Sequence, residues 1–361
     1  MLDRSCRKRT AAGTGAAKLS AMVAGMLCIA PALAQPGGDG PAPSADEWEV
    51  PRLPNGRPDL QGIWTNKTIT PFERPQELGD QAFFTPEEAE QFVASMLERG
   101  NQDNRTDDVR DVLNAYNAFW WDRGTELLAN MRTSIVTDPP NGRIPPLVPE
   151  RQAELEAERR AITERCEQQP GCAITNSGEM GPAWDPKVLD LMTRCISFGT
   201  VVPMLPTAYN NNYQIVQSAD TVAILTEMVH QVRRIPTDGS PHLPEHVRQW
   251  FGDSKGRWEG DTLVVETRNF TGELHGRLRA ADENLRVIER FTRVAPDVLL
   301  YEFTVDDPTV WTQPWSGEIP LTRADGLLYE YACHEGNRGM ENILSAARAE
   351  MRAAGDTEKQ E

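Results

Sequence analysis

Two carboxylates occupy faces of predicted strands that are otherwise apolar. Glu289 lies in a stretch in which every second residue is apolar, and Asp307 continues the apolar face of the next predicted strand. Burying a carboxylate is unfavourable unless it is paired or used in a reaction. One interpretation is therefore a general acid or base, and the other is an ion pair with a nearby arginine. The arginines that could form this pair are Arg233, Arg290 and Arg293.

The spacing of the two carboxylates limits the chemistry that they could share. If the predicted turn between residues 294 and 298 is symmetric, Glu289 faces Phe303, and Asp307 lies about 13 Å further along the strand. That separation is too long for the carboxylate pair of a retaining glycosidase, whose carboxyl groups are roughly 5 Å apart. An acid–base site would therefore need partners from other strands.

Histidine is the side chain best suited to proton transfer near neutral pH, and all five histidines lie between residues 230 and 334. His242 lies beside a predicted turn, and His334 and Glu335 end the last predicted strand. Loops and strand ends are where functional sites are common. His230 instead continues an apolar strand face, which predicts a buried core histidine. The residues predicted to be catalytic are Glu289, Asp307, His242, His334 and Glu335.

The stretch His242-Leu-Pro-Glu-His246 matches the H-x-x-E-H string of zinc peptidases. That chemistry needs both histidines on one face of a helix, which Pro244 would break. Pro244 is better suited to the first position of a short helix over residues 244–251. We therefore predict no metal site and no cofactor. A G-x-S-x-G elbow and a phosphate-binding glycine loop are both absent from the sequence, which disfavours serine hydrolases and nucleoside triphosphatases.

Several tryptophans lie among the predicted strands. Trp258 precedes the turn Gly260-Asp261, and a two-residue turn would place it opposite Leu263. Aromatic side chains at the mouth of a barrel would suit a sugar, a sterol or an aromatic ring, whereas plain core packing is the structural alternative. The residues predicted to bind a ligand are Trp258, Trp311, Trp315, Tyr301 and Asn269.

The elements that would position these residues fall into an N-terminal part (48–200) and a C-terminal part (201–350). The N-terminal part predicts an extended stretch with a strand near Gly62–Trp64, followed by helices. These helices are predicted over 85–100, Val109–Trp121, Pro149–Arg165 and 185–195. After residue 350 the chain is predicted to be a disordered tail, 351–361, which follows a short closing helix over Gly339–Arg348.

In the C-terminal part the apolar period changes to two, and short turns separate the stretches. The predicted strands are Tyr213–Gln217, Thr221–His230, Gln231–Ile235, Gly256–Glu259, Thr262–Phe270, Leu285–Val294, Val298–Asp306, Glu318–Thr322 and Leu327–Cys333. Sequential strands with tight turns indicate antiparallel pairing. We therefore predict an α+β protein with a helical N-terminal segment packed on a C-terminal antiparallel β-barrel or sandwich, a lipocalin-like barrel included.

The first 34 residues have the features of a secretory signal, with a basic start, a short apolar core and an Ala32-Leu33-Ala34 cleavage site. Residues 35–47 are rich in Pro, Gly and Ala and are predicted to be a flexible linker. The protein would then be periplasmic or secreted. Four cysteines follow the signal, which suggests two disulfides. Three connectivities are possible, and the short loop between Cys166 and Cys172 leads us to prefer this pair, with Cys195–Cys333 as the second. A zinc site is the alternative, although the spacings are not those of a zinc ribbon or finger.

The formal net charge of −17 argues against binding to nucleic acid or to an anionic membrane surface. After the signal, no apolar run in the sequence is long enough to insert into a membrane. We therefore predict a small-molecule ligand or substrate as the partner, and the sequence does not determine the oligomeric state.

The stretch Trp250–Val265 is similar to a W-x-G-x-S-x-G-x-W-E-G-D-T-L-V-V motif of a broad family of exported bacterial proteins of unassigned function. The similarity covers most of the chain after the signal, because it extends to Arg57–Trp64, Tyr209–Gln217, Glu289–Arg290, Asp306–Pro308, Pro314–Trp315 and Glu330–Asn337. The resemblance implies export, and it implies no activity and no catalytic residue.

These features lead us to expect an exported enzyme with cofactor-free acid–base chemistry, as a hydrolase, lyase or isomerase. Its substrate would be a small glycan, a terpenoid or an aromatic compound. The alternative is a non-catalytic, lipocalin-like binding protein for a small apolar or sugar ligand.

Overall fold

The computed structural model describes residues 48–101, 121–174, 180–199, 201–273, Leu278 and 281–358. These residues belong to one compact unit, Glu47–Glu361. The predicted signal peptide (1–34) and linker (35–47) lie outside the described residues, as does the predicted helix Val109–Trp121 except for its last residue. In the described part of the chain, no helix combines the length and the apolar composition that crossing a membrane requires.

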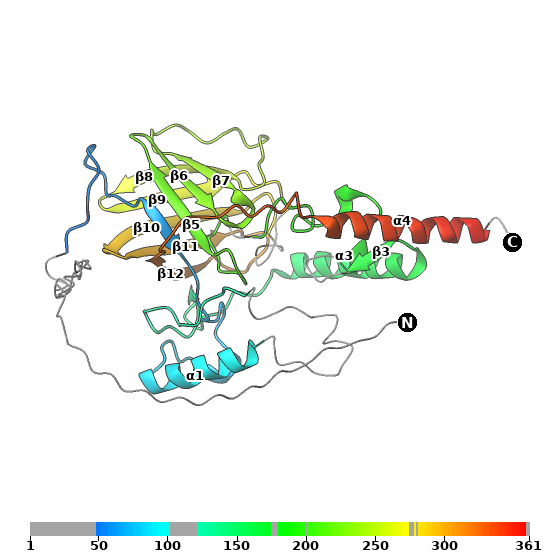
Figure 1. The fold of residues 1–361 in the computed structure, drawn as a ribbon, viewed down its shortest axis with the longest axis horizontal. Coiled ribbons are helices and arrows are strands. Elements are labelled where there is room, and N and C mark those ends of the chain that lie inside the picture. The colour runs from blue at the N-terminus through cyan, green and yellow to red at the C-terminus, as the bar shows by residue number, and fades with distance from the viewer. Residues whose placement is uncertain are drawn as a thin grey trace, which may run out of the picture. The chain divides into compact units, whose positions relative to one another are not determined.

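Antiparallel strands dominate the fold and curve into a nearly closed barrel (Figure 1). The prediction of an α+β protein with a C-terminal β-barrel is confirmed. The order of the main strands is β7-β6-β5-β1-β12-β11-β10-β9-β8, and β2 pairs with β12. The strands of this sheet are β1 (Gly62–Thr65), β2 (Val136–Asp138), β5 (Asn212–Gln217), β6 (Thr221–Thr226), β7 (Val232–Pro236), β8 (Asp253–Glu259), β9 (Thr262–Arg268), β10 (Arg286–Ala295), β11 (Val298–Asp306) and β12 (Trp315–Arg323).

Local sequence explains the hairpins of the barrel. β9 is rich in β-branched residues, which favour extended backbone. Gly260 has a φ of 59°, as a tight hairpin turn requires. Two predicted registers are confirmed. Trp258 pairs with Leu263 in the β8–β9 hairpin, and Glu289 pairs with Phe303 in the β10–β11 hairpin.

The barrel takes two strands from the N-terminal part of the chain. β1 lies between β5 and β12 and pairs with both. β2 pairs with β12 at Ser316 and Gly317. The N-terminal part therefore contributes hydrogen-bonded strands to the sheet, in addition to segments outside it.

Large side chains fill the barrel interior. Inward and outward residues alternate along β10, β11 and β12, and the inward aromatic residues have almost no accessible surface. These aromatic residues are Trp64, Tyr213, Phe291, Tyr301, Phe303 and Trp315. Glycine is needed at position 317 because a Cβ there would overlap the ring of Phe303. These rings therefore occupy much of the described barrel interior.

β7 and β8 are the two ends of the hydrogen-bonded strand order. Gly256 of β8 permits a close approach, because a Cβ there would lie 2.9 Å from the Cγ2 atoms of Ile235 and Thr237. Inside the barrel, Arg233 of β7 donates from Nε to the Oγ atom of Ser254 in β8 at 2.9 Å. Side chains therefore join the two strands at which the barrel closes.

Three described helices accompany the sheet: α1 (Pro86–Arg99), α3 (Pro149–Gln168) and α4 (Arg338–Glu358). α1 begins with the predicted capping box, in which Thr85 and Glu88 bond each other's backbone. α4 packs on the small hairpin of β3 (Cys172–Ile174) and β4 (Met180–Pro182) through Leu344 and Ala347. The short 3-10 helices are η1 (Gln76–Leu78), η3 (Pro186–Val188) and η4 (Met228–His230).

Both predicted disulfides are confirmed: Cys166–Cys172 closes the loop after α3, and Cys195–Cys333 joins residues 138 positions apart. Such bonds are compatible with an exported protein.

Several predicted elements are wrong. Residues 185–195 contain η3 and turns where a helix was expected, and 244–251 form turns where we expected a short helix. Residues 327–333 form no strand, although their alternation suggested one. In contrast, α4 continues to Glu358, into the predicted disordered tail 351–361. The secondary structure of these segments depends on tertiary contacts, which cannot be read from short-range sequence patterns.

Candidate functional site

Glu289 lies on β10 inside the barrel and has no exposed surface. The guanidinium of Arg233 contacts both carboxylate oxygens, with Nη1 2.9 Å from Oε1 and Nη2 bonded to Oε2. The same guanidinium donates to Ser254 and Thr267. A bidentate pair with further hydrogen bonds is the arrangement in which buried charges are tolerated. The geometry therefore favours the ion-pair interpretation of Glu289, with Arg233 as the partner.

Tyr301 adds a third polar group to this interior network. Its hydroxyl donates to Oε1 of Glu289 at 2.9 Å and accepts from the N–H of Met204 at 2.9 Å. Burial, followed by the charge of Glu289, raises the pKa of Tyr301 well above its usual value. The hydroxyl therefore keeps its proton and remains a donor. Tyr301 connects the loop of Met204 to the barrel interior, and its ring is covered on all sides.

The other residues predicted to bind a ligand are spread over the fold. Trp315 is fully buried, and Trp311 packs edge-on against it with ring centroids 5.9 Å apart. Trp258 is half-buried beneath the guanidinium of Arg57, which lies 5.6 Å from the ring centroid. Asn269 is buried and donates to a carbonyl of the loop that carries His242. The structure does not bring these residues together around one cavity.

Asp307 is buried in the turn after β11. Its Oδ1 accepts from the N–H and the hydroxyl of Thr309 at 3.1 and 2.6 Å, and its Oδ2 accepts from the N–H of Asp282 at 3.4 Å. Burial raises the pKa of Asp307 above its usual value, although the hydrogen bond from the Thr309 side chain opposes the shift. Through these hydrogen bonds, Asp307 holds the turn after β11 in place.

His242 forms a pair with Asp253, which sequence reasoning missed. The imidazole Nδ1 lies 2.9 Å from Oδ2 of Asp253, and both side chains are largely buried. The same oxygen accepts the N–H of Leu243 at 2.9 Å, and Nζ of Lys255 lies 3.9 Å from the other oxygen. Because a carboxylate only accepts, Nδ1 carries a proton, and Nε2 is the atom that can accept one. Asp253 was missed because 11 residues separate it from His242 in the sequence, so the contact depends on how the loop folds back.

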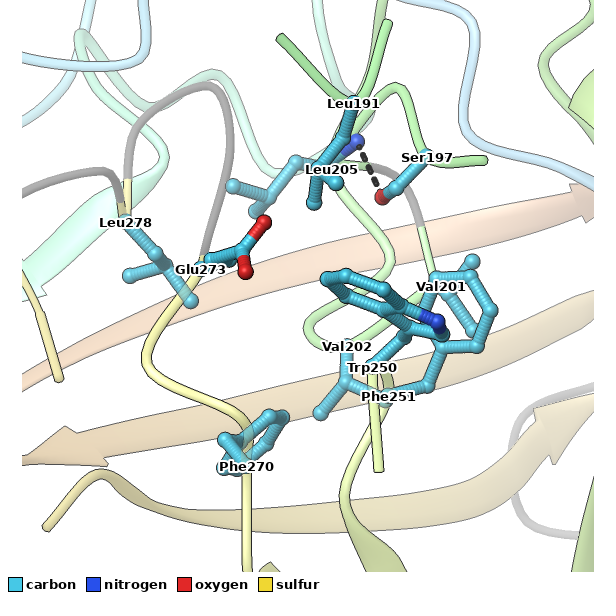
Figure 2. Close-up of a pocket in the computed structure, with 11 residues that line it drawn as sticks. Leu191, Ser197, Val201, Val202, Leu205, Trp250, Phe251, Phe270, Glu273 and Leu278 are labelled. Atoms are coloured by element: carbon cyan, nitrogen blue, oxygen red, sulfur yellow. Dashed lines mark hydrogen bonds between the residues drawn. The ribbon is translucent and has the colours of Figure 1, made fainter. Parts of the chain in front are cut away.

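The pocket at one end of the barrel is too small for an organic ligand. Figure 2 shows Trp250, Phe251 and Phe270 converging on it, with Glu273 on the opposite side. Its volume is about 20 Å³, which leaves room for about one water molecule. The side chain of Arg194 lies 3.8 Å from Glu273 and stacks over Trp250.

A much larger space, which we call the aromatic groove, lies beside the Cys195–Cys333 disulfide. Its volume is about 510 Å³. The rings of Tyr209 and Tyr331 are stacked with centroids 6.3 Å apart, and Phe198 meets Tyr331 edge-on at 5.9 Å. The groove is defined by Met192, Phe198, Tyr209, Tyr331, Asn337 and the two cysteines.

Positive φ angles gather around the aromatic groove. Six described residues other than glycine have positive φ, and four of these belong to this region: Cys195, Asn210, Val229 and His230. Val229, at 61°, is an outlier because its β-branched side chain disfavours this conformation. Strained backbone of this kind persists where the surrounding structure enforces it, and it clusters at functional sites.

Three residues discussed above lie near the groove, two of them in sequence and one in space. His334 and Glu335 directly follow Cys333, and both are exposed. His230 is also exposed, so the prediction of a buried core histidine is wrong: the chain turns after β6, at Thr226, and the strand face ends there. His230 Nδ1 lies 3.2 Å from the carbonyl oxygen of Tyr331. That carbonyl only accepts, so Nδ1 is the donor.

The predicted catalytic residues therefore do not form one site. Glu289 lies in the barrel interior, Asp307 in a turn, His242 in the loop before β8, and His334 with Glu335 beside the aromatic groove. Sequence reasoning also missed Phe198, Tyr209 and Tyr331 as groove residues. The Cys195–Cys333 pairing was the signal that could have found them, because it brings their segments together. Within the described chain, no group of three or more His, Cys, Asp or Glu residues is placed to hold a metal ion.

Comparisons of the chain with protein-family models, with curated proteins and with solved structures found no match.

Proposed function

We propose that this protein is exported and binds a small planar aromatic molecule in the aromatic groove. The observation that carries the proposal is the nearly parallel pair Tyr209 and Tyr331, at an interplanar angle of 27°, on the wall of a space of about 510 Å³. Aromatic rings attract further rings through offset stacking and edge contacts. The volume lies within the range of small-molecule sites.

Export is supported by the two disulfides and by the signal-like first 34 residues. We place the protein in the periplasm or outside the cell, with cleavage after Ala34. In an aqueous compartment of this kind, a free aromatic compound gains by leaving water for an apolar wall. This assignment departs from a lipocalin-type site, because the ligand would lie outside the barrel.

Equilibrium dialysis with 2-naphthol tests the groove. Its matched control ligand is decahydro-2-naphthol, which has the same carbon skeleton without aromatic rings. The variant Tyr331→Leu removes one stacking partner, and we expect it to weaken 2-naphthol binding about two- to tenfold. Tyr329→Leu is the control variant, because Tyr329 lies two residues away, is 78% exposed and does not line the groove.

The proposal requires that wild type prefer 2-naphthol to its saturated analogue, and that Tyr329→Leu bind like wild type. Equal affinity for the two ligands would indicate general apolar adsorption and would remove the argument from stacking. Equal loss in both tyrosine variants would place the site elsewhere.

A second candidate function is the acid–base enzyme, and the pair His242–Asp253 is the observation that favours it. A carboxylate that holds Nδ1–H leaves Nε2 free to take a proton from a substrate, as in general base catalysis. The substrate would be a small glycan, a terpenoid or an aromatic compound, and the reaction a hydrolysis, an elimination or an isomerisation.

Mass spectrometry of a mixed pool of such compounds, incubated with a catalytic amount of protein, tests the enzyme. Conversion of one compound far beyond the protein concentration is the expected result. Asp253→Asn would favour the wrong tautomer of His242 and should lower the rate by orders of magnitude, whereas Asp325→Asn, at an exposed position, should not. Turnover that survives His242→Ala would exclude His242 as the base.

A further inference from the structure

The two walls of the aromatic groove come from segments that are far apart in the sequence. Phe198 and Tyr209 belong to one wall, and Tyr331 belongs to the segment 324–337, which forms the other. The disulfide Cys195–Cys333 joins the two segments across a sequence separation of 138 residues. Both cysteines line the groove, so the covalent link is itself part of the wall.

The segment 324–337 has little burial to hold it in place. Hydrogen bonds at Ala324, Tyr331 and Asn337 connect it to the rest of the described chain, at 2.9, 3.2 and 2.9 Å. Leu327 and Tyr329 are each 78% exposed, and residues 327–333 form no strand. Segments with few buried contacts open at low free energy. Without the covalent link, this wall would therefore separate from its partner readily.

The facing wall carries backbone strain at the cysteine itself. Cys195 has a φ of 56°, and Asn210, next to Tyr209, has a φ of 55°. A left-handed conformation in a residue other than glycine persists when its surroundings enforce it. The disulfide and the Asn337 amide, 3.4 Å from the Cys195 sulfur, are restraints of that kind. In contrast, the barrel interior is held by its own packing and by the Arg233–Glu289 pair.

We propose that the Cys195–Cys333 disulfide assembles the ligand site, so that the protein binds its aromatic ligand when this bond is oxidised and not when it is reduced. This inference rests on the proposed function. In the oxidising step, the two thiols lose two protons and two electrons to a disulfide oxidant by thiol–disulfide exchange. A dithiol reverses the step: it becomes a disulfide and returns two thiols to the protein. Binding would thus be confined to the oxidising compartment into which the protein is exported.

The test compares the two disulfides of one protein. The double variant Cys195→Ser/Cys333→Ser removes the groove bond, and Cys166→Ser/Cys172→Ser removes the other bond as a matched control. Equilibrium dialysis measures 2-naphthol binding, hydrogen exchange follows the amides of 324–337, and far-UV circular dichroism reports the sheet. We expect the groove variant to lose about tenfold or more in affinity, because its wall is no longer preorganised. Exchange in 324–337 should rise while the dichroism of the sheet is kept, and the control variant should match wild type.

A second comparison avoids dependence on the folding of the groove variant. In Cys166→Ser/Cys172→Ser, Cys195–Cys333 is the one disulfide left among the described residues, so the same sample can be measured before and after dithiothreitol. Unchanged affinity and unchanged exchange after reduction would overturn the inference. If wild type fails to bind 2-naphthol, the proposed function fails. Hydrogen exchange then still tests whether the Cys195–Cys333 disulfide orders the segment 324–337. Faster exchange after reduction would support this ordering role, without the claim about ligand binding.

Discussion

At the scale of single residues, Glu289 shows how one side chain can suggest two opposite roles. Its place on an apolar strand face predicted either a catalyst or an ion pair, and the structure supplies Arg233 on both of its oxygens. A carboxylate held in this way has its lone pairs engaged by Arg233 and Tyr301. It therefore serves to hold the barrel interior together.

A double-mutant cycle would measure this pair. We expect Arg233→Met and Glu289→Met each to lower the free energy of unfolding by about 3–5 kcal/mol, because each leaves a buried charge without its partner. The double variant should be clearly more stable than the sum of the two losses predicts.

Urea unfolding provides these free energies, and the exposed pair Arg290–Glu259, at 3.1 Å, is the matched control. Its coupling should be about 0–1 kcal/mol. Additive losses at Arg233 and Glu289 would contradict a coupled buried pair.

At the scale of elements, polar residues at the ends of strands find their hydrogen-bond partners in turns and loops. Asp307 organises the turn after β11 through Thr309 and Asp282. Asp253, at the start of β8, holds the loop of His242. The strand pattern predicted that Asp307 follows a strand, but it did not include Asp253, because the predicted strand began at Gly256. It could not predict their partners, because those come from loops with no periodic pattern.

The turn at Asp307 predicts a specific pH dependence. Burial raises the pKa of Asp307 in the folded protein above its ordinary value of 3.8. The folded state then binds this proton more tightly than the unfolded chain does. The contribution of Asp307 to stability is therefore fully present below its unfolded pKa and is lost as the pH rises through its folded pKa.

Urea unfolding of wild type and Asp307→Asn between pH 3.5 and 7 tests the sign. The stability of wild type relative to the variant should fall as the pH rises, whereas Asp325→Asn should show no such trend relative to wild type, because Asp325 is exposed. A relative stability that rises with pH at position 307 would show that the hydrogen bonds outweigh burial.

At the scale of the whole molecule, the barrel depends on strands contributed by both parts of the chain. β1 lies between β5 and β12 and closes a gap that the C-terminal strands would otherwise leave open (Figure 1). Unpaired strand edges promote aggregation. The C-terminal part is therefore incomplete as a folding unit.

We expect residues 201–350 expressed alone to aggregate or to lack a stable sheet, because β5 and β12 lose their shared partner. A chain that begins at residue 48 keeps β1 and should remain monodisperse with a cooperative unfolding transition. Size-exclusion chromatography and thermal unfolding distinguish the two. A stable, cooperative barrel formed by 201–350 would show that β1 is dispensable.

Much of this fold was predictable from the sequence because its signals are local. Alternation of apolar residues defined β9, β10 and β11, the Gly260 turn set a hairpin register, and a short loop between cysteines indicated the pair Cys166–Cys172. Apolar alternation alone does not ensure a strand, because a strand also needs a neighbouring strand to pair with. Residues 327–333 and residues 227–230 alternate in the same way, but neither stretch forms a strand.

The sequence by itself determined most of the barrel strands and the acidic charge, and it favoured the pair Cys166–Cys172, because each depends on residues close together or on composition alone. The tertiary structure alone decided that Arg233 neutralises Glu289, that β1 joins the barrel, and that Tyr209 and Tyr331 meet beside a disulfide. These contacts join residues tens to hundreds of positions apart. Their partners are selected by the packing of the whole sheet, and no local pattern encodes that selection.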